Sequence, residues 1–367
     1  MKVAIVGAGT AGLYCAVSLL ESLPKFIKVD LIHSRVINPI EVGESSLVSF
    51  PHALSCGVDY VHHFDAAELG STIKFGVQFK NWNGDPFIPF ASGAYGIQFD
   101  TTKLPRFILP RLNKMYQNFS EKLKTVKEIK SLGKKVSIDG QIYDYVIDCR
   151  GYPEDYSDYI ISDKVYLDSG IVVKSYTPGD WEYTYHIAHE HGWMFGIPLQ
   201  ERTAWGYLWN SEVTSELEAQ SNLVNLLGEY QIEYFSEDCR QFKFKNYYAK
   251  SIVNEDGNIF VNGNRALFLE PIQATSLGCY GLINGLIIDS IENKHYDHEK
   301  YTTVMDEVIK FINLHYYNGS NYNTPFWNRA QEGAREVLNG INPEKYDWKY
   351  VIDWTPQFRQ KMFESFL

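Results

Sequence analysis

Cysteine is scarce in this chain, and its pattern excludes a disulfide framework. Five cysteines are spread over 367 residues, without a CxxC pair or a Cys/His spacing typical of metal sites. The histidine groups at 62–63 and 186–191 do not have the spacing of metal ligands either. Secreted domains that depend on disulfides carry cysteines at denser, even-numbered spacings. We therefore expect reduced thiols, a cytoplasmic protein and no metal site.

Basic charge and long apolar runs are also missing. The chain has 34 Lys and Arg against 45 Asp and Glu, and its net charge of -11 excludes the basic footprint of nucleic-acid binding. No run reaches the roughly 18 apolar residues of a membrane span. The apolar stretch 1–24 contains one basic residue, a glycine-rich break and no convincing cleavage site, which is not typical of a signal peptide. We expect neither nucleic acid nor a membrane as a partner.

Aromatic residues, by contrast, are abundant. They make up 15% of the chain, including 26 tyrosines and 8 tryptophans, which favours aromatic-lined pockets. With 45% hydrophobic residues the chain can bury a large core. No internal repeat, low-complexity tract or linker interrupts it. We therefore expect residues 1–367 to form a single intertwined unit.

The first residues predict a dinucleotide-binding turn. "KVAIV" (Lys2–Val6) is a continuous apolar run, typical of a buried parallel strand. "GAGTAG" follows, and then an apolar helix and a second strand. In this GxGxxG pattern Gly7 permits the tight turn, Gly9 lets a pyrophosphate approach the backbone, and Gly12 lets the helix pack closely on the strand. The helix N-terminus would supply free N–H groups to the phosphates.

The end of the second strand departs from that pattern. An Asp or Glu about 20 residues beyond the turn normally binds a ribose hydroxyl. Here the position is His33, with Asp30 three residues earlier. A histidine can donate or accept one hydrogen bond to a ribose, or else this contact has weakened. The sequence leaves both readings open.

Two later segments have the pattern of a return to the same cofactor. "YVIDC" (Tyr145–Cys149) reads as a buried strand that follows a hairpin and ends at Gly151. Residues 258–291 read as a strand, a glycine turn, Pro271 and a glycine-rich helix start. A strand followed by glycine is what a flavoprotein beginning with GxGxxG commonly uses to return to its cofactor.

Five collinear motifs carry a resemblance to a known family. They are "VGESS" (42–46), "GSTIKFGVQFKNW" (70–82), "WMFGIP" (193–198), "FLEPIQATSLG" (268–278) and "NTPFWNRA" (323–330). Together with the glycine turn they resemble the flavin-dependent halogenases of the tryptophan halogenase family. That family has VGE(S/A)T, a segment with the catalytic lysine, WxWxIP and FLEPLESTG at the corresponding places.

The resemblance implies a fold. We predict an α/β, FAD-binding Rossmann-type fold like that of the aromatic hydroxylases. Residues 160–245 alternate as antiparallel strands do, residues 121–130 are typical of a charged helical face, and the chain from about residue 296 is helical. The antiparallel strands would form an interleaved sheet and the last helices a C-terminal cover. The expected FAD-binding parts are about 1–82, 105–155 and 245–292, and the expected substrate-covering parts about 83–104, 156–244 and 293–367.

The resemblance also implies a reaction. FADH2, oxygen and a halide (chloride, bromide or iodide) give hypohalous acid, which a lysine delivers to an electron-rich aromatic, indole- or phenol-like substrate. We expect an oxidoreductase that takes FADH2 from a separate flavin reductase, because no second GxGxxG is present for a nicotinamide. The residues expected to bind the cofactor are Gly7, Gly9, Thr10, Ala11, Gly12, His33, Val42, Gly43, Glu44, Gly263, Asn264, Trp193, Phe195, Ile197 and Pro198.

The family's catalytic lysine corresponds to Lys74. It lies in "TIKFGVQF", which reads as one alternating strand with Ile73, Phe75 and Val77 on one face and the lysine on the other. A lysine on an exposed strand is usually solvated. A catalytic lysine needs a site that lowers its pKa.

The aromatic segment allows two readings. By itself "WMFGIP" is typical of a core strand. Beside Lys74 and the segment around Thr275 it is better explained as a barrier in which Trp193 and Phe195 separate flavin from substrate and exclude water. Ile197 and Pro198 complete that barrier.

Position 273 departs from the family. The family has a catalytic glutamate at the corresponding position, and this chain has Gln273. An amide can form hydrogen bonds but cannot accept a proton as a carboxylate does. The proton acceptor would then be Glu44, Glu270 or solvent, or activity would be low. Thr275 and Ser276 match the positions that hold the halide through backbone N–H groups.

Two alternatives to halogenation follow from these departures. One is a flavin monooxygenase that hydroxylates an aromatic ring. The other is a degenerate fold that binds a ligand without turnover, since His33, Asn264 and Gln273 have each lost a charge that the pattern normally carries. The sequence leaves open the native substrate, the preferred halide and whether the protein forms a homo-oligomer.

Overall fold

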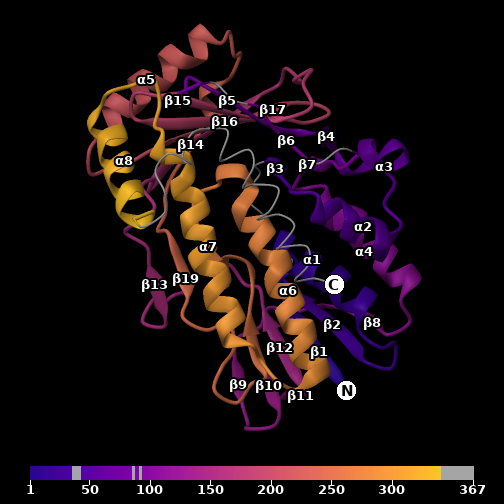
Figure 1. The fold of residues 1–367 in the computed structure, drawn as a ribbon. Coiled ribbons are helices and arrows are strands. Elements are labelled where there is room, and N and C mark those ends of the chain that lie inside the picture. The colour runs from indigo at the N-terminus through magenta and orange to yellow at the C-terminus, as the bar shows by residue number, and fades with distance from the viewer. Residues whose placement is uncertain (35–42, 85–86, 91–92, 340–367) are drawn as a thin grey trace.

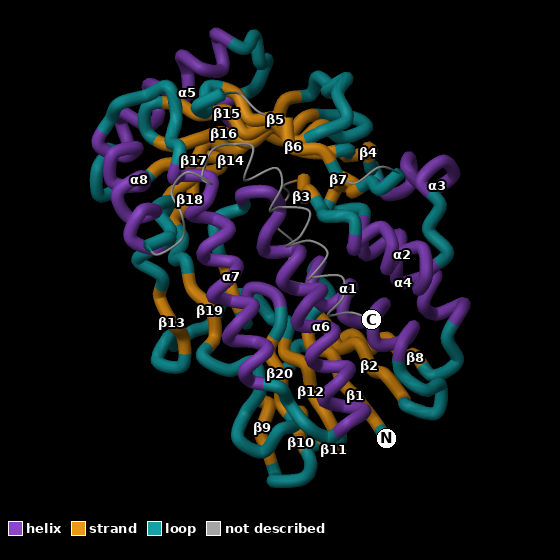
Figure 2. Tube along the Cα trace, in the orientation of Figure 1, coloured by secondary structure: helices purple, strands orange, loops and turns teal. Residues whose placement is uncertain are grey.

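Two sheets lie at opposite ends of the molecule, and two long helices run between them (Figures 1 and 2). The computed structural model describes residues 1–34, 43–84, 87–90 and 93–339. Figure 2 shows strands gathered at both ends and helices filling the middle. The site has to be sought where these layers meet.

The N-terminal sheet is parallel throughout and has the order β20-β12-β1-β2-β8. Its strands are β1 (Lys2–Val6), β2 (Lys28–His33), β8 (Phe119–Leu123), β12 (Tyr145–Asp148) and β20 (Ile259–Val261). Helix α1 (Thr10–Ser22) follows the glycine turn. The predicted strand, turn and helix are therefore confirmed. All five strands have their carboxyl ends at one edge, which is where open α/β sheets bind ligands.

The charged stretch 121–130 is not a helix, so that prediction is wrong. It ends β8 and enters β9 (Ile129–Ser131), which pairs with β10 (Val136–Ile138) and β11 (Gln141–Tyr143). Charged side chains of this stretch contact residues of the neighbouring strand β2. Lys122 donates to Asp30 of β2, and Glu121 contacts His33.

A small sheet connects the two large ones. It consists of β3 (Gly43–Ser45), β7 (Gly96–Asp100) and β4 (Thr72–Lys74), with helices α2 (Ser49–Val58), α3 (His62–Leu69) and α4 (Leu104–Met115) beside it. The single strand predicted for 72–79 is two strands, β4 and β5 (Gly76–Lys80), which belong to different sheets. The break lies at Phe75, whose N–H donates to the carbonyl of Glu182. At Gly76 a Cβ would lie 2.4 Å from the carbonyl oxygen of Ile88, so only glycine permits the crossing.

The larger sheet has the order β18-β14-β17-β16-β15-β5-β6 and is antiparallel except between β15 and β5. Its remaining strands are β6 (Phe87–Pro89), β14 (Ser169–Ser175), β15 (Thr184–His189), β16 (Gly192–Pro198), β17 (Thr203–Trp209) and β18 (Arg240–Lys243). On β16, Trp193 and Phe195 face the main core, whereas Met194 packs in a second cluster with Leu223 of α5 (Glu216–Glu229). The predicted antiparallel strands are confirmed; α5, which begins with a capping box at Ser215, was not predicted.

The C-terminal part is helical, as predicted, over the residues that the structure describes. Its helices are α6 (Thr275–Asn293), α7 (His298–Tyr317) and α8 (Pro325–Val337). Short elements precede them: β13 (Tyr159–Ile161), β19 (Tyr247–Ala249), β21 (Leu267–Phe268), η1 (Ser236–Asp238), η2 (Gly263–Arg265) and η3 (Ile272–Ala274). The helical run 272–293 is long and apolar enough to cross a membrane by length and composition, but 72% of its apolar window is buried inside the protein. That burial is typical of a core helix.

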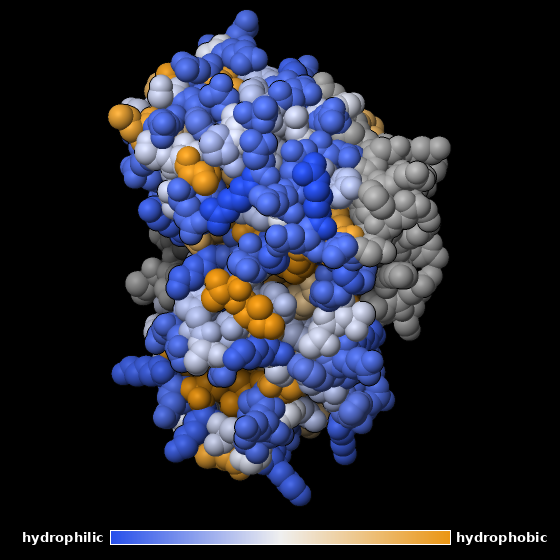
Figure 3. Space-filling model, turned by 60° about the vertical axis from the view of Figure 1, so that its left-hand side comes forward, coloured by the Kyte–Doolittle hydropathy of each residue, from blue (hydrophilic) through white to orange (hydrophobic). Residues whose placement is uncertain are grey.

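The outer surface carries no single large apolar area on the face that Figure 3 shows. Hydrophilic side chains dominate there, and apolar side chains gather in several small separate groups. Such a surface is ordinary for a folded domain. The functional site is therefore better sought among the buried polar groups.

Candidate functional site

The turn after β1 leaves room for a ligand at one of its three glycines. Gly7 has φ +110°, and a Cβ there would lie 2.8 Å from the carbonyl oxygen of Cys149. A Cβ at Gly12 would lie 1.9 Å from the carbonyl oxygen of Gly7. At Gly9 nothing lies within 4 Å of a Cβ. Two glycines thus serve close packing, and the third leaves open backbone at the N-terminus of α1, where Thr10 begins the helix.

Strand β3 connects this turn with the aromatic segment. The Thr10 hydroxyl donates to Glu44 Oε1 (3.1 Å). Burial raises the pKa of Glu44 to about 7. A Cβ at Gly43 would lie 3.3 Å from Ile197 Cγ2, so β3 packs directly against β16. Val42, predicted to bind the cofactor, lies outside the described residues.

The turn at η2 lies against the first turn of α1. Gly263 has φ +65°, and a Cβ there would lie 2.5 Å from Ala11 Cβ. Asn262 Oδ1 accepts from the Gly263 N–H (2.7 Å). The side chain of Asn264 accepts a hydrogen bond from Tyr280 (2.7 Å). The predicted cofactor residues of this segment are thus brought to the glycine turn, with the Asn264 side chain held by α6.

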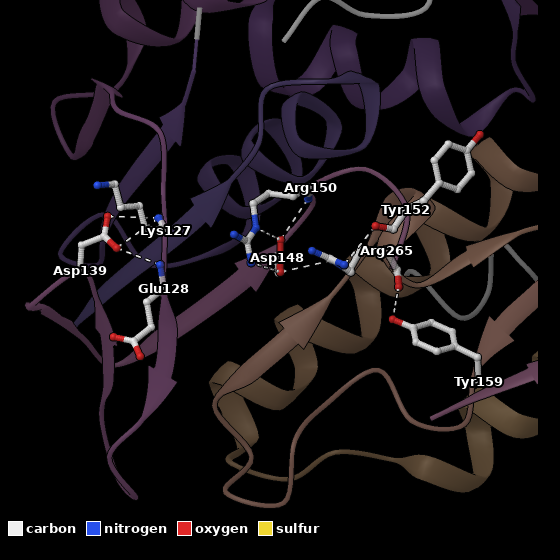
Figure 4. Close-up of polar contacts among 8 residues, drawn as sticks. All are labelled: Lys127, Glu128, Asp139, Asp148, Arg150, Tyr152, Tyr159 and Arg265. Carbon is white, nitrogen blue, oxygen red and sulfur yellow. Dashed lines mark hydrogen bonds and ion pairs between the residues drawn. The ribbon is translucent and has the colours of Figure 1, made fainter. Parts of the chain in front are cut away.

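A cluster around Asp148 ties the end of β12 to η2 (Figure 4). Asp148 accepts from Arg150 Nε (2.9 Å) and Nη2 (2.8 Å) and lies 3.4 Å from Arg265 Nε. Arg265 donates to the carbonyl of Tyr152 (3.1 Å), and Tyr159 donates to the carbonyl of Arg265 (2.7 Å). Sequence reasoning missed this cluster, although an Asp and an Arg at the end of a cofactor strand were a visible signal.

His33 contacts a carboxylate from the neighbouring strand. Its Nε2 lies 2.9 Å from Glu121 Oε1, and both side chains are mostly buried. An acidic side chain was expected at the end of β2, and the carboxylate found at this edge comes from β8 instead. Whether His33 itself contacts a ribose stays a prediction.

Lys74 is fully buried at the end of β4, not solvated. Its Nζ donates to Ser45 Oγ (2.9 Å), which lies 2.8 Å from Thr184 Oγ1. Thr184 in turn donates to Gln98 Oε1 (2.9 Å). Because the single hydroxyl proton of Thr184 is used on Gln98, Ser45 must donate to Thr184 and presents a lone pair to Lys74. The serine was within a recognised motif, but its role was not foreseen.

Glu44 and Ser45 are neighbours on β3 and contact two different parts of the site. Glu44 reaches the glycine turn through Thr10, and Ser45 reaches Lys74. The hydroxyl of Thr72, two residues before Lys74, also donates to the carbonyl of Pro198 (2.7 Å). The glycine turn, the lysine and the aromatic segment are therefore joined by direct contacts.

Gln273 lies in a strained turn at the start of α6. Gln273 and Ala274 both have left-handed φ angles, +52° and +61°, which are unfavourable for side chains with a Cβ. The backbone N–H of Gln273 donates to His186 Nε2 (3.4 Å), and its side chain contacts His315 Nε2 (2.7 Å). The hydroxyls of Thr275 and Ser276 donate to the carbonyls of Ile272 and Leu269. A halide at this helix start stays a prediction.

His186 contacts Gln273 and is close enough to Lys74 to be affected by its charge. Burial lowers its pKa well below the ordinary value, and the charge of Lys74 lowers it further. Its ring centroid is 4.6 Å from that of Trp193. Sequence reasoning considered this histidine only as a metal ligand. No group of three or more potential metal-binding side chains is found in the described part of the chain.

The aromatic segment is anchored by a buried chain of hydrogen bonds. Trp193 Nε1 donates to the Tyr316 hydroxyl (2.9 Å), which donates to Glu270 Oε1 (2.6 Å). Burial raises the pKa of Glu270 to about 8. The Phe195 ring lies 6.4 Å from that of Trp193. The segment is thus both a core strand and a neighbour of the Lys74 and Gln273 cluster.

Two proteins of similar sequence are tryptophan halogenases. The model of the tryptophan halogenase family matches residues 2–144 and 133–341. Tryptophan 7-halogenase RebH of Lentzea aerocolonigenes is 23% identical over 230 residues, which cover 57% of this chain and 42% of RebH. Tryptophan 6-halogenase ThaL of Streptomyces albogriseolus is 21% identical over 428 residues, covering 90% of this chain and 78% of ThaL.

Solved structures agree on the fold. A tryptophan halogenase from Shewanella frigidimarina NCIMB 400 has a TM-score of 0.77 at 17% identity, covering 100% of this chain and 93% of that one. Xcc4156, a flavin-dependent halogenase from Xanthomonas campestris, has a TM-score of 0.77 at 17% identity, covering 100% and 95%. The predicted FAD-binding Rossmann-type fold is confirmed. The chain belongs to the tryptophan halogenase family.

Proposed function

We propose that this protein is an FADH2-dependent halogenase that acts on an electron-rich aromatic substrate of the indole or phenol type. The observation that carries the proposal is the fully buried Lys74, linked through β3 to the glycine turn and through Thr72 to the aromatic segment. A buried lysine that donates to a neutral hydroxyl suits the delivery of an electrophilic halogen.

The residues around the glycine turn fit FAD. The open backbone at Gly9 and the N-terminus of α1 suit the pyrophosphate, which is drawn to free N–H groups and the helix dipole. Gly263 and Asn264 lie against the same turn, and His33 with Glu121 lies at the ribose end. Bound FADH2 would supply, with oxygen, the oxidising power that converts a halide into hypohalous acid.

Lys74 and the aromatic segment have separate roles in this proposal. Lys74 would hold hypohalous acid by donating an N–H, while Ser45 keeps the amine in place. Trp193 and Phe195 would separate the flavin from the substrate and exclude water from the route between them. The hydrogen bond from Trp193 to Tyr316 fixes the orientation of the indole ring in that barrier.

The remaining parts of the proposal concern the halide, partners and organisation. Chloride, bromide or iodide would lie at the start of α6, at Thr275 and Ser276, where the helix dipole attracts anions. A separate flavin reductase would supply FADH2, in the cytoplasm. We assign FAD to about 1–82, 105–155 and 245–292, and the substrate cover to the parts between and after them.

The test is mass spectrometry of products from a panel of indoles and phenols. The protein is supplied with FAD, a flavin reductase, NADH, oxygen and each halide in turn. Lys74→Met removes the amine but keeps the apolar stem, and Lys80→Met, at an exposed position on β5, is the matched control. We expect a halogenated product from the wild type and the control, and none from Lys74→Met.

Three other outcomes contradict the proposal. A product that gains one oxygen atom makes the protein a monooxygenase. Equal halogenation by Lys74→Met means that free hypohalous acid acts in solution. Absence of FAD binding, measured by fluorescence quenching, leaves a degenerate fold.

A further inference from the structure

Two buried histidines surround Gln273 from different elements. His186 comes from β15 and is 1% exposed, and His315 comes from α7 and is 0% exposed. The ring of Phe79 packs against both imidazoles, with centroid distances of 5.1 Å and 5.4 Å. Gln273, itself 1% exposed, contacts His186 with its backbone and His315 with its side chain. All three side chains are therefore buried.

The hydrogen bonds define the tautomer of His315. Its Nδ1 lies 2.8 Å from the carbonyl oxygen of Phe311. A carbonyl only accepts, so Nδ1 carries the proton. The other nitrogen, Nε2, lies 2.7 Å from Gln273 Nε2, which only donates. His315 is therefore neutral and accepts from the amide of Gln273.

His186 is neutral for the same kind of reason. Its Nε2 accepts from the backbone N–H of Gln273 (3.4 Å). Nδ1 then carries the proton, and it has no hydrogen-bond partner among the described residues. Its lowered pKa agrees with this neutral state. Gln273 thus donates two N–H groups to two imidazole lone pairs.

This arrangement suits an amide and opposes a carboxylate. A glutamate at 273 has no N–H to donate, so its oxygen would face the lone pair of His315 Nε2. Only a proton added to the pair would relieve that contact. Donation to His315 also directs the amide oxygen of Gln273 away from the imidazole, and the left-handed turn at Gln273 and Ala274 is held by both contacts.

We propose that His186 and His315 are positioning residues that clamp Gln273 as a double donor and so fix the direction in which its side-chain oxygen accepts a hydrogen bond. The glutamine then orients the halogen-delivering species but takes no proton from the substrate. This inference rests on the proposed function and specifies how the site works with an amide at position 273.

The first experiment is independent of turnover. The full chain is labelled with ¹⁵N-histidine, and the imidazole nitrogens are observed by NMR near neutral pH. The His315 signals are assigned by their loss in His315→Gln. We expect one protonated nitrogen, Nδ1, in the wild type, and two protonated nitrogens when Gln273→Glu is introduced. A doubly protonated His315 in the wild type, or a single proton on Nε2 instead of Nδ1, overturns the clamp.

The second experiment measures kcat with the halogenation assay. His315→Phe keeps a flat apolar ring but removes the acceptor, and His315→Gln restores an acceptor oxygen. We expect His315→Phe to lower kcat about tenfold, the equivalent of one lost hydrogen bond. His315→Gln should recover most of that loss, while the Kd for FAD stays unchanged in both. His63→Phe, at an exposed histidine of α3, is the matched control.

The outcomes separate the clamp from the proposed function. Unchanged kcat in His315→Phe, or no rescue by His315→Gln, contradicts the clamp in an active enzyme. If the wild type halogenates nothing, the proposed function fails, and the NMR experiment still decides whether the clamp exists.

Discussion

Individual buried side chains decide most of the chemistry of this site. A lysine on an exposed strand is usually solvated. Lys74 is instead completely buried, and its amine donates a hydrogen bond to Ser45. Gln273 replaces the family's catalytic glutamate and cannot accept a proton as that glutamate does, but it contacts the imidazoles of His186 and His315. Glu270 is also fully buried, and its raised pKa makes it a measurable reporter of this region.

We predict that Glu270 makes folding stability fall as pH rises. Burial raises its pKa from an ordinary 4.5 to about 8, so the folded state binds its proton more tightly than the unfolded state. The favourable contribution is therefore complete below about pH 4.5 and is lost as pH rises toward about 8. Glu270→Gln should remove this loss. In that window the free energy of unfolding of the mutant should therefore increase relative to that of the wild type by up to about 1.4 kcal/mol per pH unit.

Urea unfolding at a series of pH values measures this difference. Glu292→Gln, at an exposed position near the end of α6, is the control and should give a curve parallel to the wild type. A constant difference between Glu270→Gln and the wild type across the window would contradict the burial of a protonated Glu270.

At the scale of elements, a short strand and a crossing between two sheets bring the parts of the site together. Strand β3 contacts the glycine turn with one residue and Lys74 with the next. The crossing at Phe75 moves the chain from the small sheet to the large one immediately after Lys74. The turn after β1 also combines two roles within six residues. Gly7 and Gly12 permit close packing, and Gly9 leaves the backbone open for a ligand.

We predict opposite effects for two alanine substitutions in that turn. Gly12→Ala places a Cβ against the carbonyl oxygen of Gly7 and should destabilise folding by about 3 kcal/mol. Gly9→Ala meets no atom within 4 Å and should leave folding stability nearly unchanged. It should weaken FAD binding at least about tenfold, because the added methyl occupies the space for the pyrophosphate.

Urea unfolding and FAD fluorescence quenching measure the two effects. Gly228→Ala, at an open helical position in α5, is the control for adding a methyl group. Unchanged FAD affinity in Gly9→Ala would mean that the cofactor lies elsewhere.

At the scale of the whole molecule, the proposed FAD site is assembled from segments far apart in the chain. The glycine turn, the end of β12 and η2 meet at one edge of the parallel sheet, and α6 passes beside them, where Tyr280 donates to Asn264. A ligand that contacts all of them binds only the folded protein. Binding is therefore coupled to global stability.

We predict that FAD stabilises the full chain against unfolding. At a free FAD concentration 100-fold above its Kd the gain should be about 2.7 kcal/mol, measured by urea unfolding with and without the cofactor. Gly9→Ala at the same FAD concentration should show a smaller gain. Equal stabilisation of both proteins would indicate binding away from the glycine turn.

The sequence by itself determined the features that depend on local chemistry. The strand, glycine turn and helix at the N-terminus follow from a buried apolar run and from three glycines with separate steric reasons. The motifs around Lys74, Trp193 and Gln273 were enough to place the chain in its family. Even the departure at 273 could be read from the sequence, because it is a change of functional group at one position.

Only the tertiary structure decided the features that depend on distant partners. The split at Phe75 depends on Glu182, and the charged stretch near residue 121 is a strand because Asp30 and His33 receive its side chains. His315 contacts Gln273 from 42 residues along the chain, and no local pattern records that pairing. Burial and hydrogen-bond direction arise when separate elements pack together, and these properties turn a lysine and a glutamine into a candidate site.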